Sequence, residues 1–225
     1  MKFSFGGVRM RLAFAAVFVV VLATMASAQY LHPKIGKETT IRNVVILPAK
    51  VDVVRSSMKG PEGMAAESEE LSSRVEKMVS EVLASQKKIM TLSGPASEGG
   101  GQAKYTVADI QGKFDDLLPK VMKKRGDVKK GRFTMGDEVL NLNLDKRADA
   151  IVFIRGQGQK LTSGKTAFTL LVGGAPAYLR LQIGIVDARS GEVLLYTDPI
   201  LGGDPTTATD RLRKALEKGF KKLPG

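Results

Sequence analysis

The chain has 225 residues, of which 43% are hydrophobic and 26% charged, so it can bury the core of one domain, or of two small ones at most. It has no cysteine and a single histidine, His32, which excludes disulfide frameworks, thiolate metal sites, cysteine nucleophiles and a lipidated cysteine. The net charge of +12, from 35 basic and 23 acidic residues, indicates an anionic partner or surface.

Residues 1–28 have the three parts of a cleaved signal peptide. A basic segment is followed by an apolar core from Leu12 to Ala23 and by an Ala-Ser-Ala cleavage site. The core rises only about 18 Å as a helix, less than the roughly 30 Å of hydrocarbon that a membrane-spanning helix must cross. We therefore expect an exported protein, periplasmic or extracellular, that begins at Gln29 and has no integral membrane span after cleavage. Retention of the segment as an N-terminal anchor is the alternative.

Residues 29–40 show no apolar period and are predicted to form a flexible arm in front of a single α+β domain over 41–225. His32 lies in this arm without a second histidine or a paired acid beside it, so it is interpreted as exposed and inert rather than as a base or a ligand. A calcium loop of the type Asp-x-Asp-x-Asp-Gly is absent from the sequence. No metal and no cofactor are predicted.

The first part of the domain is predicted to alternate between strand and helix. Residues 43–54 contain an apolar run that ends at Pro48, which is typical of a buried first strand. Apolar residues three and four positions apart over 71–83 predict an amphipathic helix. A short strand follows at 88–92, and the glycine-rich residues 93–104 are predicted to be a flexible loop.

The second helix is predicted to begin at Thr106, which forms a capping box with Asp109. Pro119 is expected to kink or shorten this helix. The strongly basic residues 120–132 are predicted to be a loop. Residues 135–144 fit either a short helix or irregular structure.

The last part of the chain contains the clearest sheet signals. An apolar strand is predicted at 150–154, a short strand at 167–172, and a hairpin over 178–196, whose first strand alternates apolar with polar residues. A final helix lies within 204–222. Together these elements predict an α+β fold with a single mixed sheet and helices packed on it, in the order βαβαβ followed by a β-hairpin and a C-terminal helix.

Three short segments resemble a known family. They are the strand that ends in Leu47-Pro48, the strand after Ala148-Asp149-Ala150, and the hairpin sequence from Gly184 to Val193. Over about residues 41 to 222 the chain resembles the domain shared by the TolB N-terminal region, the curli-secretion protein CsgG and the LpoB-type activators of penicillin-binding proteins. The resemblance implies a bacterial envelope protein that binds other proteins, and it brings no catalytic residues. The chain lacks the lipidated cysteine of the lipoprotein members and a long pair of membrane-spanning strands, so pore formation is not expected.

Enzymatic motifs are weak in this sequence. Residues 158–166 end like a phosphate-binding P-loop, but five residues instead of four separate the first glycine from Gly-Lys-Thr, and a strand is predicted to follow. Nucleotide binding is therefore not expected. No Gly-x-Ser-x-Gly occurs. Paired carboxylates from distant segments keep an envelope-polymer hydrolase open as an alternative.

Two surfaces are candidates for binding. Seven cations fall within residues 120–132, opposed only by Asp127, and form either a solvated loop or an anion-binding surface for lipid, glycan or acidic protein. The apolar segment 168–178 forms either a tight turn or an exposed hairpin tip that meets a partner. The predicted anion-binding residues are Lys123, Lys124, Arg125, Lys129, Lys130 and Arg132.

The sequence thus predicts a non-enzymatic, exported envelope protein that acts through protein–protein contacts. Its expected partner is an envelope protein or an anionic envelope surface. Nucleic acid is not expected as a partner, since an exported protein meets little of it. The alternatives are an envelope-polymer hydrolase with carboxylate catalysis and a basic binder of anionic lipid or glycan.

Overall fold

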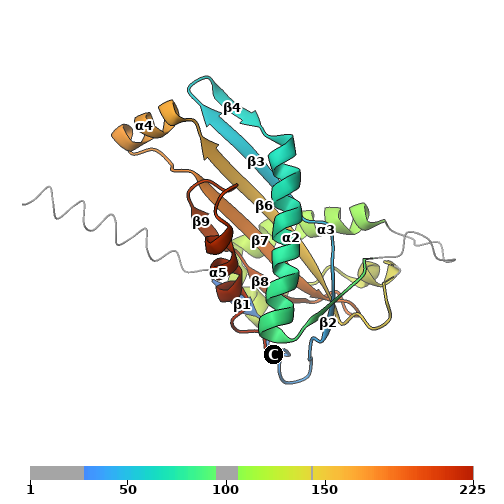
Figure 1. The fold of residues 1–225 in the computed structure, drawn as a ribbon. Helices are drawn as coiled ribbons and strands as arrows, with labels where there is room; N and C mark the ends of the chain where they lie inside the picture. The colour runs from blue at the N-terminus through green and yellow to red at the C-terminus, as the bar shows by residue number, and fades with distance from the viewer. Residues whose placement is uncertain (1–27, 95–105, 143, 225) are drawn as a thin grey trace, which may run out of the picture.

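The computed structural model describes residues 28–94, 106–142 and 144–224. Within them, one mixed sheet of nine strands carries helices on both faces (Figure 1), which confirms the predicted fold class. The strands are β1 (Gln29–Leu31), β2 (Asn43–Ile46), β3 (Lys50–Ser57), β4 (Gly60–Gly63), β5 (Met90–Leu92), β6 (Ala150–Leu161), β7 (Tyr178–Asp187), β8 (Val193–Thr197) and β9 (Ile200–Gly202). The helices are α2 (Ala65–Lys87), α3 (Val107–Lys123), α4 (Ser163–Val172) and α5 (Thr209–Gly219), with 3-10 helices η1 (Arg125–Lys130) and η2 (Asp137–Asn141). The predicted signal peptide and most of the loop 93–104 lie outside the described residues.

Strand β6 organises the sheet, whose order is β1-β8-β7-β6-β2-β5. It pairs antiparallel with β7 along its length, parallel with β2 near its start and parallel with β3 near its end. The buried first strand predicted to end at Pro48 is confirmed as β2, whereas the remainder of 43–54 belongs to a separate strand, β3. Proline has no N–H to donate to a neighbouring strand, so the chain leaves the sheet there and re-enters it as β3.

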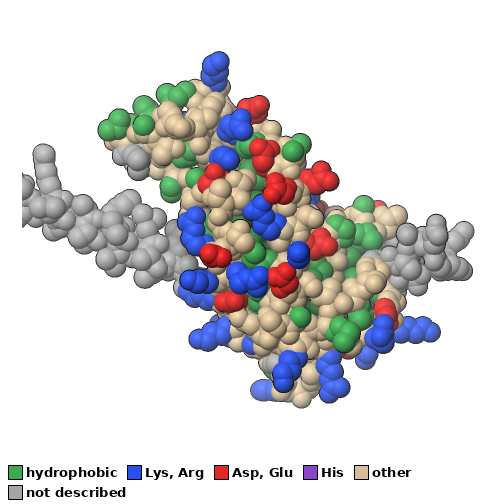
Figure 2. Space-filling view, viewed as in Figure 1, with side chains coloured by type: hydrophobic (Ala, Val, Ile, Leu, Met, Phe, Trp, Pro, Cys, Tyr) green, Lys and Arg blue, Asp and Glu red, His purple; other side chains and the backbone are tan. Residues whose placement is uncertain are grey.

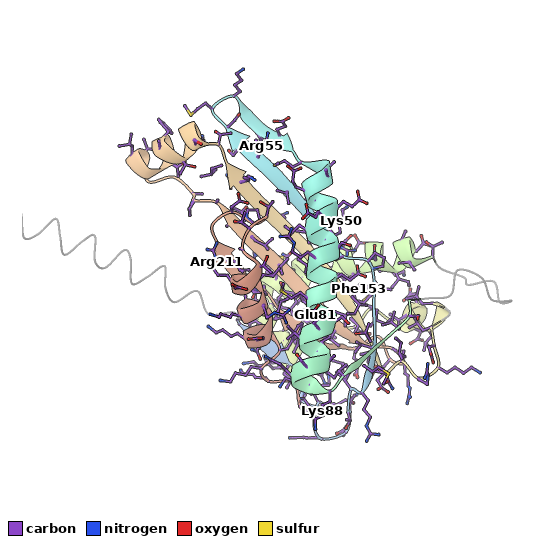
Figure 3. The ribbon with its side chains drawn as sticks, in the orientation of Figure 1. Lys50, Arg55, Glu81, Lys88, Phe153 and Arg211 are labelled. Carbon is purple, nitrogen blue, oxygen red and sulfur yellow. The ribbon has the colours of Figure 1, made fainter. Side chains whose placement is uncertain are left out.

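The core has two layers, one on each face of the sheet. On one face α2 and α5 pack their apolar stripes against the sheet, and Val79 and Val82 of α2 are fully buried. On the other face lie α3 and the 3-10 helices. There Phe114 of α3 stacks on Phe153 of β6 with ring centroids 4.5 Å apart, and Figure 3 shows Phe153 near the middle of the molecule.

Helix α3 starts as predicted but ends later. Asp109 N donates to Thr106 Oγ1 at 3.2 Å and Thr106 N donates to Asp109 Oδ2 at 2.8 Å, which completes the capping box. The helix continues through Pro119 to Lys123 rather than being shortened there. The predicted basic loop at 120–132 is thus wrong: it is the last turn of α3 followed by η1. Buried side chains in both elements, including the fully buried Val128, hold this segment on the sheet.

Residues 167–172 are a helix, so the predicted strand there is wrong. Thr162 caps α4 by accepting a hydrogen bond from Lys165 N at 3.4 Å, and Gly173 ends it in the left-handed conformation at φ 72°. The strand predicted at 150–154 is confirmed, but it continues to Leu161 as β6. The hairpin of β7 and β8 is confirmed, and Asp187 Oδ1 shapes its turn by accepting the N–H groups of Arg189 and Ser190 at 2.8 Å each.

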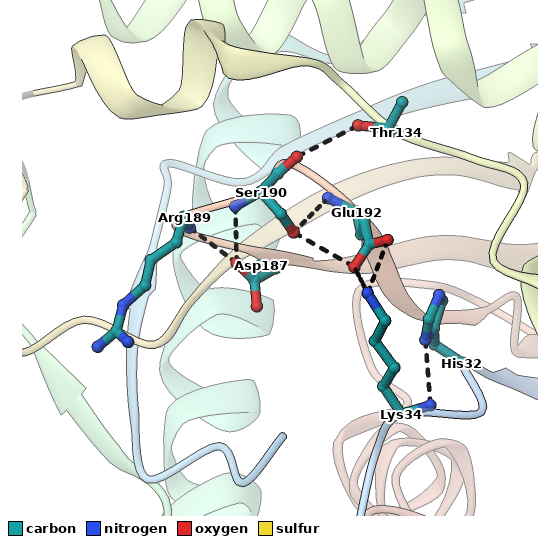
Figure 4. A network of polar contacts seen from close by, with 7 residues as sticks. All are labelled: His32, Lys34, Thr134, Asp187, Arg189, Ser190 and Glu192. Atoms are coloured by element: carbon teal, nitrogen blue, oxygen red, sulfur yellow. Dashed lines mark hydrogen bonds and ion pairs between the residues drawn. The ribbon is translucent and has the colours of Figure 1, made fainter. Parts of the chain in front are cut away.

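The segment before β2 is ordered rather than a flexible arm. Strand β1 pairs antiparallel with β8, and His32 is 3% exposed, so the prediction of an exposed histidine is wrong. Figure 4 shows how this segment meets the β7–β8 turn: Lys34 Nζ bonds both oxygens of Glu192, and Lys34 N donates to His32 Nδ1 at 3.2 Å. Three residues of strand are too few for a periodic signal in sequence, and their partner lies far along the chain.

We expect the Lys34–Glu192 ion pair to make stability depend on pH. The hydrogen bond from Lys34 lowers the pKa of Glu192 from its ordinary 4.5, so the pair stabilises the fold above that pH and is lost as the pH falls through the folded-state pKa. Lys34→Met should therefore melt below wild type at pH 7, and the two melting curves should converge toward pH 3. A constant difference across that range would contradict the assignment.

Candidate functional site

The first candidate surface is the end of the molecule where α4 projects. Figure 2 shows hydrophobic side chains gathered at this end, next to the turn between β3 and β4. Phe168, Leu171 and Val172 of α4 are 44%, 85% and 60% exposed, and Met58 in the turn is 63% exposed. Lys165 Nζ lies 5.7 Å from the ring centroid of Phe168. The apolar surface predicted for 168–178 is thus present, but a helix carries it rather than a hairpin tip. We call the exposed side chains of Phe168, Leu171, Val172 and Met58 the α4 patch.

The second candidate surface lies on the α3 side of the sheet. Helix α3 covers only part of this face, and beyond it neighbouring residues of β3, β6 and β7 form rows across the sheet. The rows are Lys50, Arg155 and Gln182; then Asp52, Gln157 and Arg180; then Val54, Gln159 and Tyr178. The alternating residues Val51 and Leu181 point to the opposite face and are buried in the core. The open face is consequently polar while the covered face is apolar.

Two neighbouring cavities open along these rows. The larger, of about 550 Å³, lies between the rows and the flank of α3, and the smaller, of about 320 Å³, extends toward Tyr178 and Pro61. Asp52 and Gln157 line both cavities. We call the combined space the sheet groove. Its volume falls in the range of small-ligand sites.

Arg155 fixes one wall of the sheet groove. Its side chain is 8% exposed, and its Nε and Nη2 atoms reach the two carboxylate oxygens of Asp115 on α3 at 2.5 and 3.3 Å. Nη1 donates to Ile154 O at 3.0 Å and Nη2 to Gln111 O at 3.4 Å. Because the guanidinium is occupied by these partners, Arg155 holds α3 on the sheet and its charge is compensated within the protein.

A second buried charge cluster adjoins the groove. Asp198 Oδ2 forms an ion pair with Arg125 Nη1 at 2.9 Å, and Arg180 Nη2 lies 3.7 Å from the same oxygen. Burial raises the pKa of the Asp198 carboxyl, against the opposing effect of the two arginines, and burial also raises the pKa of Tyr196. Two cations share one carboxylate, so the cluster keeps a net positive charge next to the groove.

Of the six predicted anion-binding residues, five are exposed and only Arg125 is partly buried, but most of them already contact a residue of this chain. Arg125 is committed to the buried Asp198, while Lys130 and Arg132 lie 3.4 and 3.6 Å from Asp127. Lys129 lies over the ring of Tyr30 at 5.6 Å from its centroid. Lys123 and Lys124 are exposed at the end of α3 and have no ion pair within the described residues. Anion binding by this set stays a prediction.

Metal-ligating clusters are absent from the described residues. No group of three or more histidine, cysteine or acidic residues in 28–94, 106–142 and 144–224 could hold a metal ion. The groove contains two carboxylates, but Asp115 is occupied by Arg155, which leaves Asp52 as its free acid. Helix α4 begins at Ser163, within the P-loop-like segment 158–166, where a strand was predicted to follow, yet the glycine spacing still departs from a P-loop. In the described part of the chain no helix is both long and apolar enough to span a bilayer.

Comparisons with known proteins show a distant likeness of fold. No protein-family model matches the chain, and neither does any curated protein sequence. The chain is similar to PelC from Paraburkholderia phytofirmans, solved as a dodecamer, with 10% identity over 88% of this chain and 96% of that chain and a TM-score of 0.44. It is also similar to the LpoB C-terminal domain from Salmonella enterica, with 10% identity over 74% of this chain and 87% of that chain and a TM-score of 0.28. LpoB belongs to the resemblance found in sequence, whereas no sequence match supports TolB or CsgG. Likeness at this level carries no conclusion about function.

The sheet groove is absent from the sequence-based predictions. A signal for it exists, because Arg155, Gln157 and Gln159 alternate with glycines and Lys160 directly after an apolar strand, and Lys50 and Asp52 have the same spacing of two. Such alternation indicates a strand with one polar face. Which strands lie side by side, and in which register, is set by pairings over a hundred residues apart.

Proposed function

We propose that this protein is an exported, non-enzymatic protein of the bacterial envelope that acts by binding another protein through the α4 patch. The single observation that carries the proposal is the exposure of Phe168, Leu171 and Val172 on one short helix at the end of the molecule. Exposed apolar side chains that gather in one place mark contact sites, whereas isolated ones need no explanation. Export is supported by the signal-peptide pattern of residues 1–28.

The energetics of the patch fit a moderate protein contact. Burying the exposed part of each of these three side chains contributes roughly 1 to 2 kcal/mol. Part of this gain is offset by the loss of translational and rotational freedom on association. The patch alone therefore fits a reversible contact, and polar contacts around it would set its strength and specificity.

Site-specific photo-crosslinking in intact cells tests the proposal. A photoreactive residue at position 171 should yield a discrete protein adduct, identified by mass spectrometry, and Phe168→Asp in the same chain should abolish it. The matched control places the photoreactive residue at Met90, which is 59% exposed on β5 and lies outside the α4 patch. Because Leu171 is 85% exposed, the photoreactive residue placed there should leave the melting temperature close to wild type.

Three results would overturn the proposal. The first is an adduct at position 171 no different from that at 90, and the second is adducts only with lipid. The third is turnover of an envelope polymer by the purified protein that disappears in Asp52→Asn, which would favour the hydrolase alternative.

A further inference from the structure

The sheet groove differs from the α4 patch in both chemistry and position. Its floor is the open face of β3, β6 and β7, and its wall is the flank of α3, formed by Leu118, Pro119 and Met122. At the far end stand Tyr178 and Pro61. The groove thus has a polar floor between two apolar sides, an arrangement that suits an elongated ligand with both polar and apolar faces.

The backbone of the floor is closed to a ligand. β3 pairs with β6, and β6 with β7, along the stretch that lines the groove, so the main-chain N–H and C=O groups of β6 are used within the sheet. A peptide that binds by adding a strand needs a free strand edge, and this floor offers none. Whatever binds here must be recognised by side chains.

The floor's free side chains both donate and accept hydrogen bonds. Lys50, Asp52 and Gln157 are exposed, and none of their side chains has a hydrogen bond or ion pair with any described residue. A carboxylate accepts, an ammonium donates, and an amide does both. Hydroxyl groups, which donate and accept at one atom, match this mixture better than a ligand of a single hydrogen-bonding type.

The charges of the groove favour an acidic ligand. Asp115 compensates Arg155, and the free Asp52 balances Lys50. Arg180 and Arg125 both interact with the single carboxylate of Asp198, and Arg125 lies closer to it. The Arg180 end of the groove therefore carries the excess positive charge. A carboxylate on the ligand would be attracted to this end.

We propose that the sheet groove binds an acidic oligosaccharide. Sugar hydroxyls bond Asp52, Gln157 and Lys50, a uronate-type carboxylate lies toward Arg180, and the apolar faces of the sugar rings pack on Tyr178. The binding is independent of the protein partner at the α4 patch. It gives the protein a second ligand class, a polyanionic glycan.

Calorimetric titration with a defined probe tests the proposal. Hexagalacturonic acid should bind the mature chain at low salt, while a neutral glucose hexasaccharide should bind at least tenfold more weakly. Lys50→Gln and Gln157→Ala should each weaken the acidic probe about fivefold to tenfold. The matched control, Lys77→Gln, removes an exposed lysine from α2 on the other side of the sheet and should not alter the affinity.

Mapping and competition complete the test. Backbone amide shifts induced by the probe should fall on β3, β6, β7 and the flank of α3, and unchanged melting temperatures should show that the variants are folded. Equal weakening by Lys77→Gln would mean that net charge alone attracts the probe. Tighter binding of hexaglutamate than of hexagalacturonate would indicate an acidic peptide, and no binding of either would leave the groove without this ligand; each of these results overturns the proposal.

Discussion

Val79→Asp should lower the free energy of unfolding by about 4 kcal/mol or more, a large fraction of the roughly 5 to 15 kcal/mol that stabilises a typical domain. Val79 is fully buried at the centre of the apolar stripe of α2 and belongs to the core between that helix and the sheet. An aspartate there either stays charged without a partner or binds a proton at a large cost, because Val79 lies within a cluster of buried apolar side chains. Urea unfolding followed by circular dichroism measures the loss.

The matched control is Ser73→Asp, which adds the same charge to the exposed side of α2. It should change stability by no more than about 0.5 kcal/mol. Equal melting temperatures for Val79→Asp and wild type would show that α2 is not packed on the sheet. Equal losses in both variants would show that the added charge, rather than its burial, is responsible.

The elements that sequence predicted well are those whose signals are local. The stripe of α2 repeats within one helix, and the capping box of α3 needs only Thr106 and Asp109. The β7–β8 hairpin joins neighbouring strands through a turn that Asp187 stabilises. In each case the residues that determine the structure lie within a few positions of one another, so pattern and structure coincide.

The errors fall where distant contacts decide the conformation. Residues 167–172 are apolar enough for a strand, but β7 already has β6, β8 and β9 as neighbours and the segment is capped as a helix instead. His32 appears isolated in sequence, yet in the fold it lies against Gly131, where a Cβ would come within 2.5 Å of its Nε2. Neither outcome can be obtained from a window of neighbouring residues.

The candidate surfaces follow the same division. The apolar composition of 168–178 predicts the α4 patch directly, because that prediction does not depend on which strands pair. The sheet groove needs the register that places Asp52 beside Gln157 and Gln157 beside Arg180. The basic run is visible in sequence as charge density, but the ion pair of Arg125 with Asp198 is not, since it depends on how β8 packs on η1.

Gly191→Ala should destabilise the protein by roughly 2 to 4 kcal/mol, and it tests the turn that the family resemblance rests on. Gly191 has φ 69°, which disfavours any residue with a Cβ, and that Cβ would lie only 2.3 Å from Gly136 O. The neighbouring atom is backbone, so relief requires the loop before η2 to move. That movement would break the hydrogen bond from Met135 N to Gly191 O, now 2.8 Å.

Gly112→Ala supplies the matched comparison within the same fold. Gly112 is exposed in α3, has no atom within 4 Å of the added Cβ and has no positive φ, so alanine should stabilise the helix by about 0.5 to 1 kcal/mol. The two substitutions add the same methyl group and should shift the thermal midpoint in opposite directions. If Gly191→Ala melts like wild type while Gly112→Ala gains stability, the turn tolerates a side chain, and the close approach of the β7–β8 turn to Gly136 does not fix the hairpin's geometry.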